Sequence, residues 1–183
     1  MTVIQSKSGF TPDDLLRMDE EGLFELVDGK LIEKQIGYLS NLTAGMVVGE
    51  LRAHGAGAVL PEQSFRCFPN DPDRIRRPDV ACIIASRAAG ISAEGHVTVV
   101  PDIAVEVVSP NDLVVELEEK LADYRAAGVK LVWVIDPQSR TVRIQRADHS
   151  VAHQDESGVL SGESVLPGFS VAVSEILPPK AGG

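Results

Sequence analysis

The stretch PDIAVEVVSP, residues 101–110, places the strongest constraint on how this chain folds. Its run of β-branched and other apolar residues is typical of a strand that is covered on both faces of a sheet. Glu106 nevertheless lies in the middle of the run. Because moving a carboxylate out of water is costly unless its charge is compensated, a buried Glu106 needs a cationic partner.

A second apolar run, PDVACII at 78–84, contains Asp79 near its start. If the two runs pair as neighbouring strands, Asp79 and Glu106 come close together and repel each other. A shared hard cation such as Mg²⁺, which commonly takes one or two protein carboxylates, would remove this repulsion. Two alternatives stay open, with Asp79 as a turn or capping residue and Glu106 in an ion pair with a core arginine.

Lys120 is a third polar candidate, in the segment DLVVELEEKLADYRAAG at 112–128. At about 100° per residue this segment forms an amphipathic helix, and Lys120 falls beside its apolar stripe, so the lysine can lean toward the sheet. The stripe consists of Leu113, Leu117, Leu121 and Tyr124. The alternative is an exposed ion pair between Lys120 and Glu116, one turn earlier.

The other sequence patterns predict one α/β sheet whose strands are joined by helices. Asn111 or Asp112 is expected to cap the helix that contains Lys120, and Gly128 to end it, so that this helix crosses one face of the sheet. The remaining predicted elements are a short helix from Thr11, a hairpin at 24–34 around Asp28-Gly29, a helix at 39–54, a strand at 58–68, and a hairpin of strands 129–136 and 141–147, followed by a short apolar segment at 169–177.

Length and composition bound the class of protein. With 183 residues, 44% of them hydrophobic, and no repeat or linker, we expect a single domain over 1–183 with a short polar tail from about 178. No secretory signal or membrane-spanning stretch is visible, so we expect a cytoplasmic protein without membrane contact. Cys67 and Cys82 lack disulfide or zinc spacing and are expected to be buried thiols.

The formal net charge of −10 argues against general polyanion binding, because non-specific affinity for nucleic acid comes mainly from lysine and arginine contacts with phosphates. The acidic charge does not exclude a local basic patch. Arg74, Arg76 and Arg77 could contact substrate phosphates, the alternative being surface ion pairs with nearby acidic residues. A cluster of carboxylates around a metal ion also fits the charge.

Several of these stretches together resemble the Uma-type restriction-endonuclease-like family, a branch of the PD-(D/E)XK nuclease superfamily. The matching stretches are ELVDGKLIE at 25–33, PDV at 78–80, PDIAVEVVSPND at 101–112, EEKLADYRAAGVKLVWVIDP at 118–137 and LPGF at 166–169. The resemblance covers nearly the whole chain. It implies a restriction-endonuclease-like α/β (α+β) fold, in which a mixed central β-sheet is flanked by α-helices and accompanied by additional β-hairpins.

The same resemblance implies a set of site residues. Asp79 and Glu106 would be ligands of Mg²⁺ or Mn²⁺, and the backbone carbonyl of Val107 would be a further ligand. Glu25 would contribute another acidic group to the site.

The chain departs from the superfamily pattern at one position. The pattern has a lysine two residues after the glutamate, where this chain has Val108. Because Glu106 and Val108 share a strand face, that lysine would point at the metal. The resemblance implies that, in this branch, a lysine on the following helix replaces the missing one. Lys120 holds the position that matches this lysine.

The expected activity is metal-dependent hydrolysis of phosphodiester bonds in DNA, by an endonuclease that acts as a homodimer because two sites cut two strands. The metal would lower the pKa of a water molecule, Lys120 would orient that water or stabilise the phosphorane charge, and Glu25 would assist positioning. One alternative is a non-catalytic nuclease-fold module for binding or assembly, which the acidic charge favours. Another is a small-molecule hydrolase that uses the same carboxylates.

Overall fold

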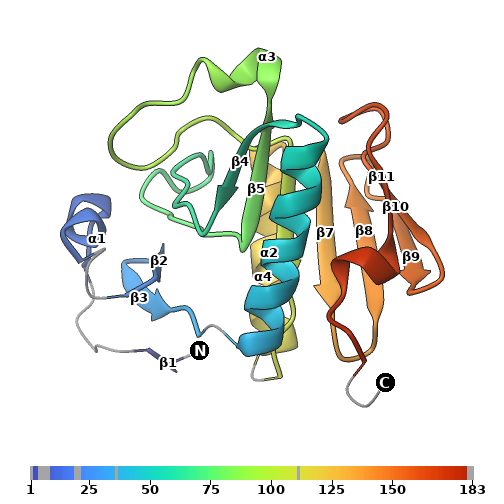
Figure 1. The fold of residues 1–183 in the computed structure, drawn as a ribbon. Coiled ribbons are helices and arrows are strands. Elements are labelled where there is room, and N and C mark those ends of the chain that lie inside the picture. The colour runs from blue at the N-terminus through green and yellow to red at the C-terminus, as the bar shows by residue number, and fades with distance from the viewer. Residues whose placement is uncertain (1, 4–8, 19–21, 36, 111, 181–183) are drawn as a thin grey trace.

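A six-stranded mixed sheet forms the centre of the fold, with strand order β4-β5-β6-β7-β8-β9 (Figure 1). The computed structural model describes residues 2–3, 9–18, 22–35, 37–110 and 112–180. The strands are β4 (Gly57–Pro61), β5 (Val80–Ile84), β6 (Ile103–Val107), β7 (Leu131–Asp136), β8 (Thr141–Arg146) and β9 (Val151–Asp155). β6 and β7 pair in parallel, and the other neighbours pair antiparallel, which confirms the predicted mixed sheet.

Helix α4 (Val114–Ala127) connects the two parallel strands, β6 and β7, and covers one face of the sheet. It ends at Gly128, whose φ of 89° is a left-handed conformation that glycine adopts without strain. The predicted cap at Asp112 is wrong, because the helix begins after Leu113 and the Asp112 carboxylate accepts the backbone amide of Ser109 instead. The other predicted cap, Asn111, lies outside the described residues.

The opposite face of the sheet is covered by helix α2 (Tyr38–Ala53) and by the C-terminal elements. These elements are β10 (Val159–Ser161), β11 (Ser170–Ala172) and the 3-10 helix η1 (Val173–Ile176), and a short helix α3 (Ala85–Ala88) follows β5. The central strands β5, β6 and β7 are therefore covered on both faces, which explains their continuous apolar sequences.

A separate small sheet of order β1-β3-β2 lies beside the central one (Figure 1). It contains β1 (Thr2–Val3) and the predicted hairpin of β2 (Phe24–Val27) and β3 (Lys30–Glu33), which turns at Asp28-Gly29. Helix α1 (Pro12–Met18) packs against β2 through Leu15, and Thr11 and Asp14 bond reciprocally at its start. Among the described residues, no helix is long and apolar enough to cross a bilayer.

Three further sequence expectations differ from the structure. The strand predicted at 58–68 ends at Pro61, because Glu62 adopts a left-handed φ of 50° that interrupts the ladder. The helical pattern predicts Leu113 on the apolar stripe, but this residue precedes α4 and is 58% exposed. Cys82 is buried as expected, whereas Cys67 is only partly buried.

Asp102, directly before β6, contacts residues at the ends of the neighbouring strands β5 and β7. Its buried carboxylate contacts Lys130 Nζ and Arg87 Nη1, each at 2.8 Å, and accepts the backbone amide of Ile84 at 3.0 Å. Burial alone would raise the pKa of Asp102, but the contacts with Lys130, Ile84 and Arg87 lower it.

The Asp102→Ala substitution is expected to lower the free energy of unfolding by about 2 to 3 kcal/mol, because it removes a satisfied buried carboxylate. Since the pKa of Asp102 is lowered by folding, its contribution is present above the unfolded pKa and is lost as the pH falls through the folded one. Urea denaturation at neutral and acid pH measures both effects. The matched control is Asp148→Ala. Asp148 is an exposed turn residue, so this substitution should change the free energy of unfolding little.

Candidate active site

The antiparallel pairing of β5 with β6 brings the two predicted metal ligands together. Val80 is opposite Val105, so Asp79, directly before β5, lies next to the end of β6. The Asp79 Oδ2 atom accepts the backbone amide of Val107 at 2.6 Å. This contact fixes the carboxylate beside Glu106, in the arrangement expected from neighbouring strands.

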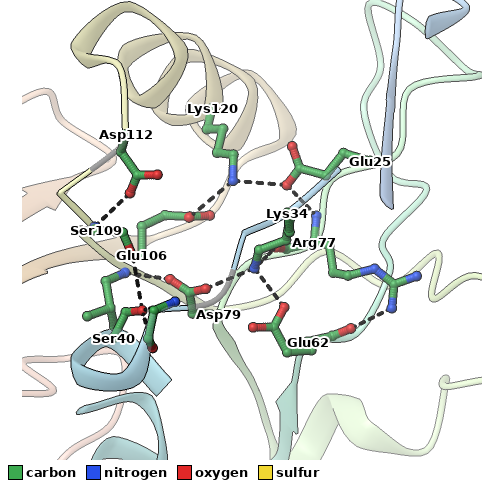
Figure 2. Close-up of polar contacts among 12 residues, drawn as sticks. Glu25, Lys34, Ser40, Glu62, Arg77, Asp79, Glu106, Ser109, Asp112 and Lys120 are labelled. Atoms are coloured by element: carbon green, nitrogen blue, oxygen red, sulfur yellow. Dashed lines mark hydrogen bonds and ion pairs between the residues drawn. The ribbon is translucent and has the colours of Figure 1, made fainter. Parts of the chain in front are cut away.

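Asp79, Glu106 and Val107 line a cleft of about 140 Å³. Its inner wall carries charged side chains, and its other walls come from the start of α2 and from the loop after β6 (Figure 2). The charged lining residues are Lys34, Glu62, Asp79, Glu106, Asp112 and Lys120. At the opening, Ser109 Oγ donates to Ser40 Oγ at 3.0 Å and joins the two walls.

Lys120 reaches into this cleft from α4. Its ammonium lies 3.3 Å from Glu106 Oε2 and 3.1 Å from Glu25 Oε1, which is plain in Figure 2. Burial alone would lower the pKa of Lys120, but the charges of Glu106 and Glu25 raise it, so the lysine stays protonated. The buried position excludes the alternative of an exposed pair with Glu116.

Glu106 is buried and has two partners from α4. Oε2 contacts Lys120, and Oε1 accepts a short hydrogen bond from the Tyr124 hydroxyl. Burial, together with the negative charges of Asp79 and Glu25, raises the pKa of Glu106 to about 7 despite the nearby ammonium groups. The ammonium groups near Glu106 therefore do not fully compensate its negative charge. A bound divalent cation would supply the missing positive charge.

Glu25 lies in β2 and is fully buried behind Lys120. Besides that lysine it contacts Arg76 Nη1 at 3.0 Å and accepts the backbone amide of Arg77 at 3.0 Å. Although burial would raise it, the charges of Lys120, Arg76 and Lys34 lower the pKa of Glu25 to about 2. Glu25 is thus ionised and contacts the Lys120 ammonium from behind, and it does not line the cleft itself.

Two charged residues of the cleft were missed by the sequence analysis. Lys34 follows β3 and contacts Asp79 Oδ1 at 2.8 Å and Glu62 Oε2 at 2.6 Å (Figure 2). Glu62 follows β4, and its amide donates to the carbonyl of Asp79 at 3.2 Å. The sequence signal for Lys34 was a lysine at the end of the hairpin predicted at 24–34, a pattern that surface lysines also produce.

The arginines before β5 have partners inside the protein. Arg76 is buried between Glu25 and Asp123, and Arg77 donates to the carbonyls of Glu62 and Phe24. Arg74 forms ion pairs as well, with Asp28, Asp71 and Asp123. These contacts pair the arginines with carboxylates and carbonyl groups of the scaffold, and contact of Arg76 and Arg77 with substrate phosphates stays a prediction.

The donor atoms of the cleft fit a hard divalent cation. Asp79 and Glu106 offer carboxylate oxygens side by side, and the backbone of Val107 borders the same space. Among the described residues, no group of three or more histidine, cysteine, aspartate or glutamate side chains has metal-binding geometry. Two carboxylates are nevertheless enough for Mg²⁺, which retains several water ligands.

Comparison with known proteins agrees with this fold. The chain is similar to a crystal structure from Anabaena variabilis described as "a putative nuclease belonging to DUF820", with a TM-score of 0.71 and 20% sequence identity over 91% of this chain and 97% of the other. No curated protein matches the sequence. Residues 12–174 match the family model described as "Uma2: Putative restriction endonuclease". Because this match spans most of the sequence, the chain belongs to the Uma2 family of restriction-endonuclease-like proteins.

Proposed function

We propose that this protein is a divalent-metal-dependent nuclease that hydrolyses phosphodiester bonds. The observation that carries the proposal is the convergence of Asp79, Glu106 and Lys120 on one cleft, from the residue before β5, from β6 and from α4. Membership of the Uma2 family supports it. Asp79 and Glu106, with the carbonyl of Val107, would hold Mg²⁺ or Mn²⁺, which when bound supplies a water of lowered pKa and neutralises phosphate charge.

The protein groups have distinct tasks in this proposal. Lys120 directs a protonated amine into the cleft, where it can donate to the attacking water or to the phosphorane oxygens. Glu25 holds that amine from behind, so it acts as a positioning residue. The Val107 amide orients Asp79, and the Tyr124 hydroxyl orients Glu106, which keeps both carboxylates preorganised for a cation.

Calorimetric titration with Mn²⁺ tests the proposed metal site without knowledge of the substrate. Wild-type protein is expected to bind, Glu106→Gln to lose at least about tenfold in affinity, and Lys120→Met to keep binding because it removes no ligand. Equal affinity in wild type and Glu106→Gln would place the metal elsewhere. Absence of binding by the wild type at millimolar metal would contradict a preformed site.

We further propose DNA as the substrate and a homodimer as the active form. Two copies of the cleft would cut the two strands of a duplex. Incubation of closed-circular DNA and of RNA with Mg²⁺, with a chelator as control, tests the substrate class. Sedimentation velocity tests the dimer, and a monomer that still linearises DNA in one step would overturn it.

A non-catalytic binding or assembly module is a second candidate function, and one observation favours it. Lys34 and Lys120 already place ammonium groups on Asp79 and Glu106, so the carboxylates have internal partners. A module of this kind would bind its partner without Mn²⁺ and would show no cleavage with any divalent metal. Metal-dependent cleavage that requires Glu106 would exclude it.

A further inference from the structure

Lys34 contacts the same carboxylate that we assign to the divalent cation. Its ammonium lies 2.8 Å from Asp79 Oδ1, 2.6 Å from Glu62 Oε2 and 2.8 Å from the carbonyl oxygen of Arg77. Because an ammonium group has three hydrogens, these three acceptors satisfy it completely. The side chain is only 6% exposed, yet it borders the cleft.

Both oxygens of Asp79 are therefore engaged within the protein. Oδ2 accepts a hydrogen bond from the Val107 amide at 2.6 Å, and Oδ1 accepts one from the Lys34 ammonium at 2.8 Å. A neutral backbone donor can stay while the carboxylate binds a metal, but an ammonium at hydrogen-bond distance repels an incoming cation. The amide thus positions Asp79, whereas the lysine opposes metal entry.

We propose that Lys34 is an internal cation that competes with the divalent metal for Asp79 and thereby sets the metal affinity of the cleft. This inference rests on the proposed function. Glu62 gives the lysine a second anionic partner, so the ammonium keeps a contact in the cleft when Asp79 binds the metal. The wild-type cleft is accordingly a weaker metal site than its carboxylates alone would form.

Mn²⁺ titration of the intact protein separates this role from a structural one. Lys34→Met should tighten Mn²⁺ binding by at least about tenfold, because it removes a positive charge next to a ligand. Lys34→Arg keeps the charge and should bind no more tightly than wild type. The matched control is Lys30→Met, which removes an equal charge from the exposed start of β3, the strand that Lys34 follows, and should leave the affinity unchanged.

The outcomes distinguish this inference from the proposed function. Damage to the fold would weaken metal binding, so tighter binding by Lys34→Met supports competition. Unchanged or weaker binding, in a variant whose thermal unfolding remains cooperative, overturns the role of Lys34 but leaves the proposed function if wild type binds through Glu106. Absence of binding in both proteins overturns both. If Lys34→Met fails to fold, Lys34→Gln replaces it under the same criteria.

Discussion

Glu106→Gln is expected to reduce metal-dependent cleavage at least about a thousandfold. The amide keeps the shape of the side chain and can still accept from Tyr124, but it removes the negative charge that would hold a metal beside Asp79. Asp79→Asn should have an effect of similar size, because the proposal makes the two carboxylates one ligand set. Initial rates with a labelled oligonucleotide, at several Mg²⁺ concentrations, measure the loss.

A substitution at the rim of the same cleft provides the matched control. Asp112 is exposed there and accepts the Ser109 amide at 2.8 Å, away from the inner charges. Asp112→Asn should therefore retain activity within a few-fold of wild type. Cleavage by Glu106→Gln at the wild-type rate would contradict the assignment of the site, as would activity in wild type that persists in excess chelator.

Glu25→Ala is expected to lower the free energy of unfolding by about 3 to 5 kcal/mol. The substitution leaves the buried Arg76 guanidinium and Lys120 ammonium without the carboxylate that lies between them. Chemical denaturation at neutral pH measures the change. The exposed Glu119 on α4 gives the control, because Glu119→Ala should alter stability by less than about 0.5 kcal/mol.

The stability that Glu25 contributes should also depend on pH. Folding lowers its pKa from 4.5 to about 2, so the contribution is complete above the unfolded value and is lost as the pH falls through about 2. Between pH 5 and pH 2 the wild type should therefore lose more stability than Glu25→Gln, by roughly 3 kcal/mol. Parallel acid profiles for the two proteins would contradict an ion-paired Glu25.

Much of the fold could be predicted because the pattern of each central strand reflects a single cause. β5, β6 and β7 are almost entirely apolar, apart from Glu106 and the terminal Asp136, because both of their faces are covered, and the turn at Asp28-Gly29 and the end of α4 at Gly128 have local chemical signals. The proximity of Asp79 and Glu106 followed from strand order alone.

The rest of the site depends on contacts between distant segments. The hairpin of β2 and β3 docks on the chain before β5 through an isolated bridge between Leu26 and Ile75, and this docking brings Lys34 to Asp79. No local pattern encodes such a bridge. The sequence suggested a metal as the main partner of Glu106, with Lys120 close to the site, whereas the structure pairs Glu106 directly with the Lys120 ammonium and adds the hydroxyl of Tyr124, which the sequence assigned only to an apolar stripe.

The crossover from β6 through α4 to β7 also bears on when the site can exist during synthesis. A nascent chain that ends before α4 already contains Asp79 and Glu106 but lacks both Lys120 and Tyr124. Its β6 strand also has no parallel partner, because β7 follows the helix. The cleft is therefore completed only after α4 and β7 have left the ribosome, and a product truncated before α4 lacks the assembled site.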